Sequence, residues 1–520
     1  MAREHRLRSS HPVASREPIP LSARRDRLDS AFPPGIGRPV PLWINGAWTP
    51  GVAGTSHPTM DPTWGRPLVD VATAASEDLE KAVEFATRAQ AGWWLMDGQD
   101  RARVLRGIAD GIRAHALALG TLDTLDAGRP IRDTATRDAE RAARIFEFFA
   151  GSTDRLRGSF IPVQPGSTNY IEYEPIGIVG AITPWNYPMT NAAGKIAPAL
   201  ATGNAVILKP AEDSPLSALL LAWIAHQAGL PAGLLCVLNG PGELIGEAIV
   251  RHPLIGKINF TGSTSVGRRI GGIAGGLLKS VTLELGGKTG FMVFADADLE
   301  RAADALVYSA FNNVGQTCTA GSRLLVEAVV AERFAEMIVS RLSRLRIGDP
   351  LDPDTQFGPA ISARQKDDVL RRIADADRDG IRRLAMARFP LPAEGYYLTP
   401  TVFLDVDPAH AVAQEEVFGP VVAVTPFSDI DEAIAIANGT RYGLATTVWT
   451  GSVMTAGRIA RQARSGIVWV NTVHSLYPGS PYGGHKDSGM GVEMGEEAVR
   501  NHMKSKSVWI NDGSWRSPWA

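Results

Sequence analysis

The sequence predicts an α/β protein with parallel strands, and three observations lead to that class. Between residues 204 and 276, apolar strand-like runs alternate with helical runs, which is typical of βαβ units around a parallel sheet. A second series in the same order follows from residue 290. The chain has 520 residues, 44% hydrophobic and 21% charged, so it can form roughly two to four globular units with large cores.

The N-terminal part is predicted to hold a disordered tail, a hairpin and a helical region. Residues 1–38 are rich in Arg, Ser and Pro and show no apolar period, which favours disorder. In PLWINGAWT, the pair Asn45-Gly46 lies between apolar flanks and predicts a tight hairpin turn. Residues 76–150 have a helical pattern, and Ser76 is the expected N-cap because acidic residues follow it directly.

Strands and helices then alternate to the C-terminus. In 167–185, alternating apolar residues predict an edge strand, and the continuous apolar run after it predicts a buried one. The segment 505–512 is a short β-like run without an obvious local partner, so we expect it to pair across a subunit boundary. The other predicted strands are 204–210, 233–240, 256–262, 442–450 and 466–472. Helices are expected at 214–229, at 242–252 and after 262. A strand followed by a helix is expected at 290–311, where the helix begins near Asp296–Asp298, and again at 322–345.

Composition excludes several classes of function. A net charge of −2 argues against a nucleic-acid-binding surface. No apolar run approaches the roughly 18 residues that a membrane span needs, and the first residues lack the apolar region of a signal peptide. The only two cysteines, Cys236 and Cys318, fit a reducing compartment, so a cytoplasmic location is predicted. No CxxC or HExxH occurs, and no metal site is expected.

A phosphate-binding turn is predicted although no clean G-x-G-x-x-G follows the first strands. FTGSTSVGRR follows a strand and opens a helix, with Gly262 and Gly267 around Ser263. Glycine lets a phosphate approach the backbone, and the helix start offers unpaired N–H groups, although a simple Gly-Ser helix cap has the same pattern. Lys209 and Glu212 come just past a strand end, where they could hold ribose hydroxyls or form a surface ion pair.

Three residues suggest nucleophilic catalysis. Cys318 lies in the small, polar GQTCTAGS, unlike Cys236, which is predicted to pack as a buried apolar residue; as a nucleophile it would need a lowered pKa or a nearby base. Glu284 lies in the apolar run VTLELGGK, where burial would raise its pKa and suit it as a general base. Asn186, in the rigid turn ITPWNYP, could donate to an oxyanion. A structural thiol, a hydrogen-bonded core Glu and an Asx turn are the alternatives.

The sequence resembles the aldehyde dehydrogenase superfamily, NAD(P)-dependent and hydrolytic, from about Leu42 to Val508. The resemblance rests on TPWNYP, GNAVILKPAEDSP, FTGSTSVG, LELGGK, GQTCTAGSR, EEVFGPV and PYGGHKDSG, in the family's order. It implies a Rossmann-like NAD-binding domain at 39–154 and 177–287, an α/β catalytic domain at 288–487, and a small β oligomerisation extension at 155–176 and 488–520. A homodimer or homotetramer is therefore expected.

The resemblance also implies roles for single residues. Cys318 would attack a small aldehyde, Asn186 and the Cys318 backbone N–H would hold the oxyanion, and Glu284 would activate water to hydrolyse the thioester. Lys195 and Glu493 would form a proton path from that base. The residues expected to bind the cofactor are Thr183, Trp185, Lys209, Glu212, Gly242, Gly262, Ser263, Gly267, Leu285, Glu416 and Phe418. We expect NAD rather than NADP, because Glu212 would repel a 2′-phosphate.

The tunnel residues favour a neutral aldehyde. The positions that resemble tunnel walls are aromatic, apolar or small, and none is an Arg or a carboxylate, so a medium-sized apolar or aromatic aldehyde is predicted. Gly194 is expected to widen the tunnel. An acylating dehydrogenase that uses coenzyme A and an inactive binding or structural protein are the alternatives. The wall positions are Tyr187, Thr190, Asn191, Gly194, Thr317, Thr319, Val473, His474, Leu476 and Tyr482.

Overall fold

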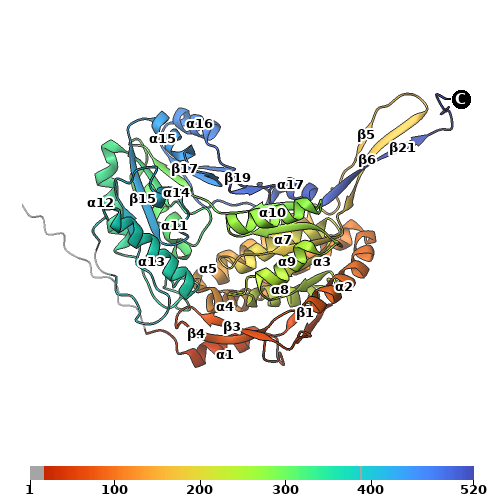
Figure 1. The fold of residues 1–520 in the computed structure, drawn as a ribbon, viewed down its shortest axis with the longest axis horizontal. Coiled ribbons are helices and arrows are strands. Elements are labelled where there is room, and N and C mark those ends of the chain that lie inside the picture. The colour runs from red at the N-terminus through yellow and green to blue at the C-terminus, as the bar shows by residue number, and fades with distance from the viewer. Residues whose placement is uncertain (1–16, 387–388, 520) are drawn as a thin grey trace, which may run out of the picture.

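A mixed sheet of eight strands forms the larger half of the protein (Figure 1). The structure is a computed structural model, and it describes residues 17–386 and 389–519. Its central strands pair in parallel and its edges antiparallel, as the continuous apolar runs predict. The predicted hairpin at Asn45-Gly46 is confirmed, since both residues have positive φ. The order is β2 (Ala47–Thr49), β1 (Leu42–Ile44), β9 (Leu235–Val237), β8 (Ala205–Lys209), β7 (Ile178–Ile182), β10 (Ile255–Thr261), β11 (Ser280–Glu284) and β20 (Gly489–Met490).

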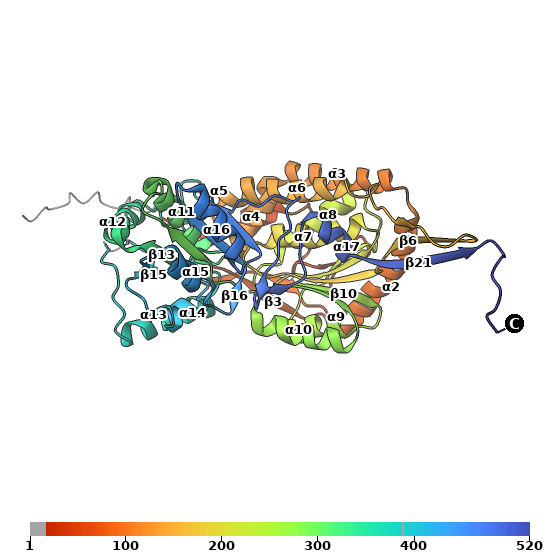
Figure 2. The same cartoon turned by 90° about the horizontal axis from the view of Figure 1, so that it is seen from above.

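Helices cover both faces of this sheet (Figure 2). The predicted helical region is confirmed, but the N-cap is Ala75 rather than Ser76, because the Asp78 carboxylate accepts from the Ala75 backbone N–H at 2.9 Å. On one face lie α3 (Gly98–Ala114), α4 (Ala116–Ala127), α6 (Ala139–Ala150), α7 (Pro188–Ala201) and α8 (Leu216–Gln227); on the other lie α2 (Ser76–Leu95), α9 (Glu247–Arg251) and α10 (Thr264–Gly276). The short α5 (Ile131–Asp133) and the π-helix η1 (Thr134–Asp138) lead into α6, and the π-helix η2 (Gly242–Gly246) leads into α9.

A second, fully parallel sheet of six strands organises the other half. The predicted helix opening is confirmed at Asp298, whose side chain accepts from Arg301 N. The sheet order is β14 (Thr401–Phe403), β15 (Val421–Phe427), β13 (Arg323–Glu327), β12 (Gly290–Val293), β17 (Ala445–Trp449) and β18 (Ile467–Val470). Its helices are α11 (Leu299–Phe311), η3 (Asn312–Gly315), η4 (Ala328–Val330), α12 (Ala331–Leu342), α13 (Ala363–Arg378), α14 (Ala411–Gln414), α15 (Ile430–Asn438) and α16 (Val453–Gln462).

A three-stranded antiparallel arm projects from the body (Figures 1 and 2). It consists of β5 (Ser159–Ile161), β6 (Ser167–Pro175) and β21 (Met503–Asn511) in the order β21-β6-β5. The prediction of a strand near 505–512 is confirmed, but it has a partner in its own chain, since β21 pairs with β6 along its whole length. Two further sheets have two antiparallel strands each: β3 (Ser56–Asp61) pairs with β4 (Arg66–Ala72), and β16 (Tyr442–Gly443) pairs with β19 (His485–Lys486). The helix α17 (Gly495–Asn501) precedes β21.

The predicted disorder of residues 1–38 is wrong for the part that the structure describes. Residues 21–31 form α1 (Leu21–Ala31), and residues 1–16 lie outside the described residues. Arg24 on this helix is fully buried and forms ion pairs with Asp61 and Asp349, two carboxylates that are far from it in sequence. These contacts supply the ordering that composition alone does not indicate. Within residues 17–386 and 389–519, no helix combines the length and hydropathy that a bilayer-spanning helix requires.

Candidate active site

A cavity of about 630 Å³ brings the three predicted reactive residues together. Glu284 is the last residue of β11, Asn186 follows β7, and Cys318 follows η3. Side chains at the carboxyl ends of parallel strands meet at one edge of a sheet, which is where open α/β sheets bind ligands. All three residues line the same cavity. Cys236, by contrast, is fully buried in the core, as predicted.

The Cys318 thiol is protonated at neutral pH in this arrangement. Its side chain opens into the cavity, and its Sγ lies 3.1 Å from the Tyr482 hydroxyl. Burial raises the pKa of Cys318 to about 12, the Tyr482 hydroxyl lowers it in part, and the charges of Glu416 and Glu284 raise it further. As a nucleophile, Cys318 would need either a lowered pKa or a nearby base. The described protein groups do not lower this pKa below its usual value.

The backbone around Cys318 is strained and closely packed. Asn313 and Val314 have φ values of 52° and 60°, which is unfavourable for a β-branched residue and typical of functional turns. Gly287 packs directly against the carbonyl of Cys318, so that a Cβ at this position would overlap the Cys318 oxygen. The Gly286-Gly287 pair in LELGGK therefore lets the Cys318 loop approach β11.

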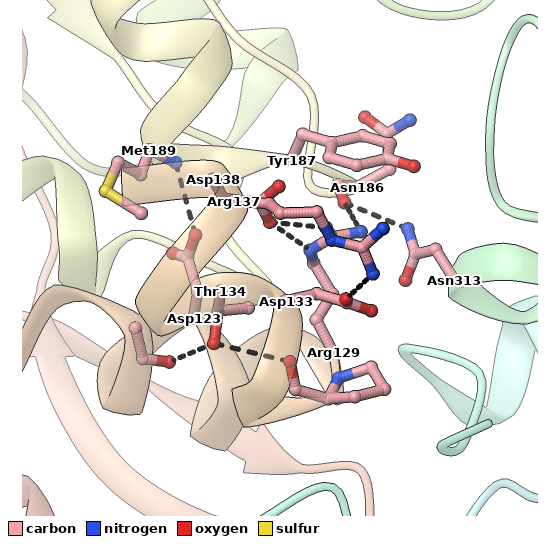
Figure 3. Close-up of polar contacts among 12 residues, drawn as sticks. Asp123, Arg129, Asp133, Thr134, Arg137, Asp138, Asn186, Tyr187, Met189 and Asn313 are labelled. Carbon is pink, nitrogen blue, oxygen red and sulfur yellow. Dashed lines mark hydrogen bonds and ion pairs between the residues drawn. The ribbon is translucent and has the colours of Figure 1, made fainter. Parts of the chain in front are cut away.

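Buried contacts hold the backbone carbonyl of Asn186 (Figure 3), and a hydrogen bond to Gln316 holds its side-chain amide. Its Nδ2 donates to Gln316 O at 3.0 Å, and its backbone carbonyl accepts from Asn313 Nδ2 at 3.0 Å. Arg129 donates to the same carbonyl at 3.4 Å, pairs with Asp138, and lies 3.8 Å from the centre of the Tyr187 ring. An amide fixed in this way is preorganised to donate a hydrogen bond.

Glu284 is a buried carboxyl group without a hydrogen-bond partner. Only 2% of its surface is exposed, and neither carboxylate oxygen has a partner among the described residues. Burial raises the pKa of Glu284 well above its usual range, Glu493 adds to the shift, and Lys195 opposes it. Lys195 is fully buried, pairs with Glu493, and donates to Thr261 Oγ1 at 2.7 Å. Glu493 and Thr261 line the cavity, whereas Lys195 lies behind its wall.

One end of the cavity offers groups that suit a dinucleotide. Helix α10 begins there, and its N-cap Ser263 lines the cavity, so unpaired backbone N–H groups face the space. Lys209 and Glu212 line the same end, and burial lowers the pKa of Lys209 to about 8. Trp185 and Phe418 form an edge-to-face pair with ring centres 5.2 Å apart. Glu416 accepts from Gly287 N at 3.0 Å, and burial raises its pKa to about 7.

Most of the predicted contact residues line the cavity, and three do not. Gly267 packs against Leu285, Val473 is half-buried and packs against the core of the second half, and Lys195 is buried. The expected widening at Gly194 is also corrected, because a Cβ there would lie 2.9 Å from the Met494 methyl, which takes up that space. The predicted residues on the wall are Thr183, Trp185, Asn186, Tyr187, Thr190, Asn191, Gly194, Lys209, Glu212, Gly242, Gly262, Ser263, Glu284, Leu285, Thr317, Cys318, Thr319, Glu416, Phe418, His474, Leu476, Tyr482 and Glu493.

Sequence reasoning missed wall residues that come from helices α6 and α13. Arg141 and Ile145 lie one turn apart on α6, and Ile145 is buried. Gln365 on α13 lines the cavity and donates to Phe418 O at 2.9 Å. No local pattern marks these residues, because each belongs to an ordinary amphipathic helix. The expected absence of Arg from the tunnel is therefore wrong.

Comparison with known proteins gives the class of this protein. A sequence model of the Aldehyde dehydrogenase family matches residues 48–508. An aldehyde dehydrogenase of Enchytraeus buchholzi is 40% identical over 473 residues, which are 90% of this chain and 95% of that protein. The chain therefore belongs to the aldehyde dehydrogenase family, a family of oxidoreductases, and the resemblance seen in the sequence is confirmed.

Two solved structures show the same fold over nearly their whole length. PnpE of Pseudomonas sp. WBC-3, in complex with nicotinamide adenine dinucleotide, is 40% identical with a TM-score of 0.90, covering 92% of this chain and 99% of PnpE. The P. syringae indole-3-acetaldehyde dehydrogenase AldA, in complex with NAD+ and IAA, is 38% identical with a TM-score of 0.90. That comparison covers 94% of this chain and 99% of AldA.

Proposed function

We propose that this protein oxidises an aldehyde to a carboxylic acid with NAD, through a thioester on Cys318. One observation carries the proposal: Cys318, Asn186 and Glu284 line one cavity, whose other end is formed by the N-terminus of α10. A nucleophile, an oxyanion donor and a desolvated base are what such an oxidation requires. In this proposal 39–154 and 177–287 bind the cofactor, 288–487 carries the nucleophile, and 155–176 with 488–520 serves assembly.

The residues at the α10 end fit a dinucleotide. Ser263 and the backbone N–H groups after it would hold the pyrophosphate, and Lys209 with Glu212 would hold the adenosine ribose. Glu416 and Phe418 would position the nicotinamide ribose and ring near Cys318. An oxidised nicotinamide bound there supplies a positive charge and accepts a hydride. NAD is favoured over NADP because Glu212 would repel a 2′-phosphate.

Cys318, Tyr482 and Asn186 would act in the first step. The Cys318 thiol loses its proton to water in the cavity, its sulfur attacks the aldehyde carbon, and the Asn186 side-chain amide donates to the oxygen that becomes negative. One preorganised oxyanion donor contributes about 3–4 kcal/mol to such a step. The Tyr482 hydroxyl, 3.1 Å from Sγ, can donate to the sulfur once its proton has left.

Glu284 would act in the second step. Its raised pKa makes the ionised carboxylate a stronger base; it takes a proton from water, and the resulting hydroxide attacks the thioester, which releases the acid and the Cys318 thiolate. The Lys195–Glu493 pair lies close enough to shift the pKa of Glu284, which supports the proposed proton path. The presence of this base argues against an acylating enzyme, because transfer to coenzyme A needs no activated water. The three reactive residues in one cavity argue against an inactive protein.

A pair of variants tests the assignment of nucleophile and base. We expect Glu284→Gln to form about one equivalent of NADH per site in a burst and then turn over at least about 100-fold more slowly, because acyl-enzyme accumulates. Cys318→Ser should give no burst while still binding NAD in a fluorescence titration. Stopped-flow absorbance of NADH measures the burst and the later turnover of both variants. A parallel run with coenzyme A tests the acylating alternative. Steady turnover of Glu284→Gln near the wild-type rate would refute the base, and a burst in Cys318→Ser would refute the nucleophile.

The arm supports a homodimer or homotetramer. Phe160, Trp509 and Ile510 on β5 and β21 are 70%, 59% and 54% exposed, although large apolar side chains on a projecting sheet are normally covered. β21 is also an edge strand within the chain. We expect light scattering to give a multiple of 55.6 kDa for the wild type and a smaller mass for Trp509→Asp. A monomeric wild type would overturn this part of the proposal.

A further inference from the structure

Arg141 is an unpaired cation on the wall of the active-site cavity. It lies on α6, is half-buried, and has neither an ion pair nor a hydrogen bond within residues 17–386 and 389–519. Its neighbours differ: Arg137 pairs with Asp133, and Arg144 pairs with Glu140. A half-buried guanidinium that loses part of its hydration is normally matched by an acid. Arg141 thus has hydrogen-bond donors and a charge that the described part of the chain leaves without a partner.

The charge of Arg141 acts on the part of the cavity next to the nucleophile. His474 lines the same cavity, and its pKa is lowered to about 4 by burial and then by the charges of Arg141 and Arg137. The His474 imidazole also interacts with the backbone of Thr319, the residue after Cys318. His474 is therefore neutral at pH 7, and Arg141 is the group with free positive charge in this region.

The acids on the cavity wall leave Arg141 available. They are Glu212, Asp213, Glu284, Asp368, Glu416 and Glu493, and none of them forms an ion pair with Arg141. Ile145, Tyr187, Leu476 and Tyr477 line the same cavity and are apolar or aromatic. The cavity has a second guanidinium, Arg364 on α13, whose charge acts on Asp213. An occupant beside Arg141 and His474 would meet apolar and aromatic side chains and the Arg141 guanidinium.

We propose that Arg141 binds a carboxylate at the far end of the substrate, so that the preferred substrate is an aldehyde with an apolar or aromatic body and a remote carboxylate. This inference rests on the proposed oxidation of an aldehyde at Cys318 and names the substrate class of that site. It replaces the neutral aldehyde expected from the sequence, because that expectation depended on a tunnel without Arg. A guanidinium binds a carboxylate through two parallel N–H···O bonds, and a neutral analogue leaves it unpaired.

A matched pair of substrates tests the proposal. 4-Formylbenzoate and methyl 4-formylbenzoate share the reacting carbonyl and the ring, and they differ in the remote charge. We expect wild-type kcat/KM to be about tenfold or more higher for the carboxylate, as one charge-assisted pair supports. Arg141→Met should lower that ratio about tenfold and leave the methyl ester within about twofold. Arg144→Met, one turn along the same helix and already paired, is the control and should keep the wild-type ratio.

A binding measurement separates this proposal from the proposed oxidation. 4-Acetylbenzoate, whose ketone cannot be oxidised to an acid, should protect Cys318 from iodoacetamide at about tenfold lower concentration than its uncharged methyl ester in the wild type, but not in Arg141→Met. If no aldehyde is oxidised and this difference is still found, the oxidation fails and the carboxylate site stands. Equal kcat/KM for the two aldehydes in the wild type, or a ratio that Arg141→Met leaves unchanged, would overturn the carboxylate site.

Discussion

At the scale of single residues, the groups around Cys318 keep its side chain a protonated thiol until a positive charge binds in the cavity. Burial and two nearby carboxylates raise its pKa to about 12, and the Tyr482 hydroxyl and the Thr319 backbone N–H are the hydrogen-bond donors that lower it in part. A hydrogen bond from a neutral donor stabilises an anion by about 1.5–3 kcal/mol in a buried site. The Tyr482 hydroxyl, which the sequence predicted only as part of the tunnel wall, therefore influences the reactivity of this sulfur.

Replacing Tyr482 with Phe should make the thiol harder to ionise. The hydroxyl lowers the pKa of Cys318, so its loss raises that pKa, and the thiolate fraction at any pH below about 12 falls. We expect iodoacetamide to alkylate Tyr482→Phe about tenfold more slowly than the wild type at pH 9. Tyr187→Phe is the matched control, since its hydroxyl bonds Thr317 Oγ1 at 2.9 Å and not Sγ. Equal alkylation rates in wild type and Tyr482→Phe would contradict the prediction.

At the scale of secondary-structure elements, the end of β11 and the turn after η3 must approach each other without side chains between them. Gly286 packs against the Glu416 carboxylate, and Gly287 packs against the carbonyl of Cys318. Both contacts are closer than any Cβ allows. The two glycines are therefore required by packing, and they allow Glu284 and Cys318 to line the same cavity.

Gly287→Ala should displace the Cys318 loop. The added methyl group would overlap backbone atoms, which cannot rotate away as a side chain can, so we expect kcat to fall at least about 100-fold. Gly272→Ala in α10 is the control: its Cβ would meet nothing within 4 Å, and alanine favours a helix, so activity should be kept. Steady-state kinetics with NAD and one aldehyde measures both variants. A Gly287→Ala enzyme with wild-type kcat would show that the loop adjusts easily.

At the scale of the whole molecule, α1 holds distant parts of the chain together. Arg24 bonds Thr63 Oγ1 at 2.9 Å and forms buried ion pairs with Asp61 on β3 and with Asp349, which follows β13 and α12 in the chain. Leu28 and Phe32 bury their side chains in the core beside it. The helix therefore ties the edge of the larger half to a loop of the other half.

Removing the Arg24 guanidinium should destabilise this connection. Arg24→Met leaves Asp61 and Asp349 buried without a counter-charge, which costs about 3–5 kcal/mol. We expect a lower urea midpoint and faster tryptic cleavage within α1. Arg38→Met removes the exposed pair with Asp29 and should cost less than about 1 kcal/mol. Similar midpoints for the two variants would mean that α1 contributes little to stability.

The sequence by itself determined the features that depend on neighbours along the chain. Continuous apolar runs predicted the parallel strands β8 and β10, Asn45-Gly46 predicted its hairpin, and Asp298 marked a helix start, because period and capping are local properties. Local context also indicated Cys318, Glu284 and Asn186. Only the tertiary structure decided which distant residues meet: Arg24 with Asp349, the Tyr482 hydroxyl with Cys318 Sγ, and Arg141 with the cavity. A single polar side chain on a helix has no periodic signal, and its role is fixed by the surface that packs against it.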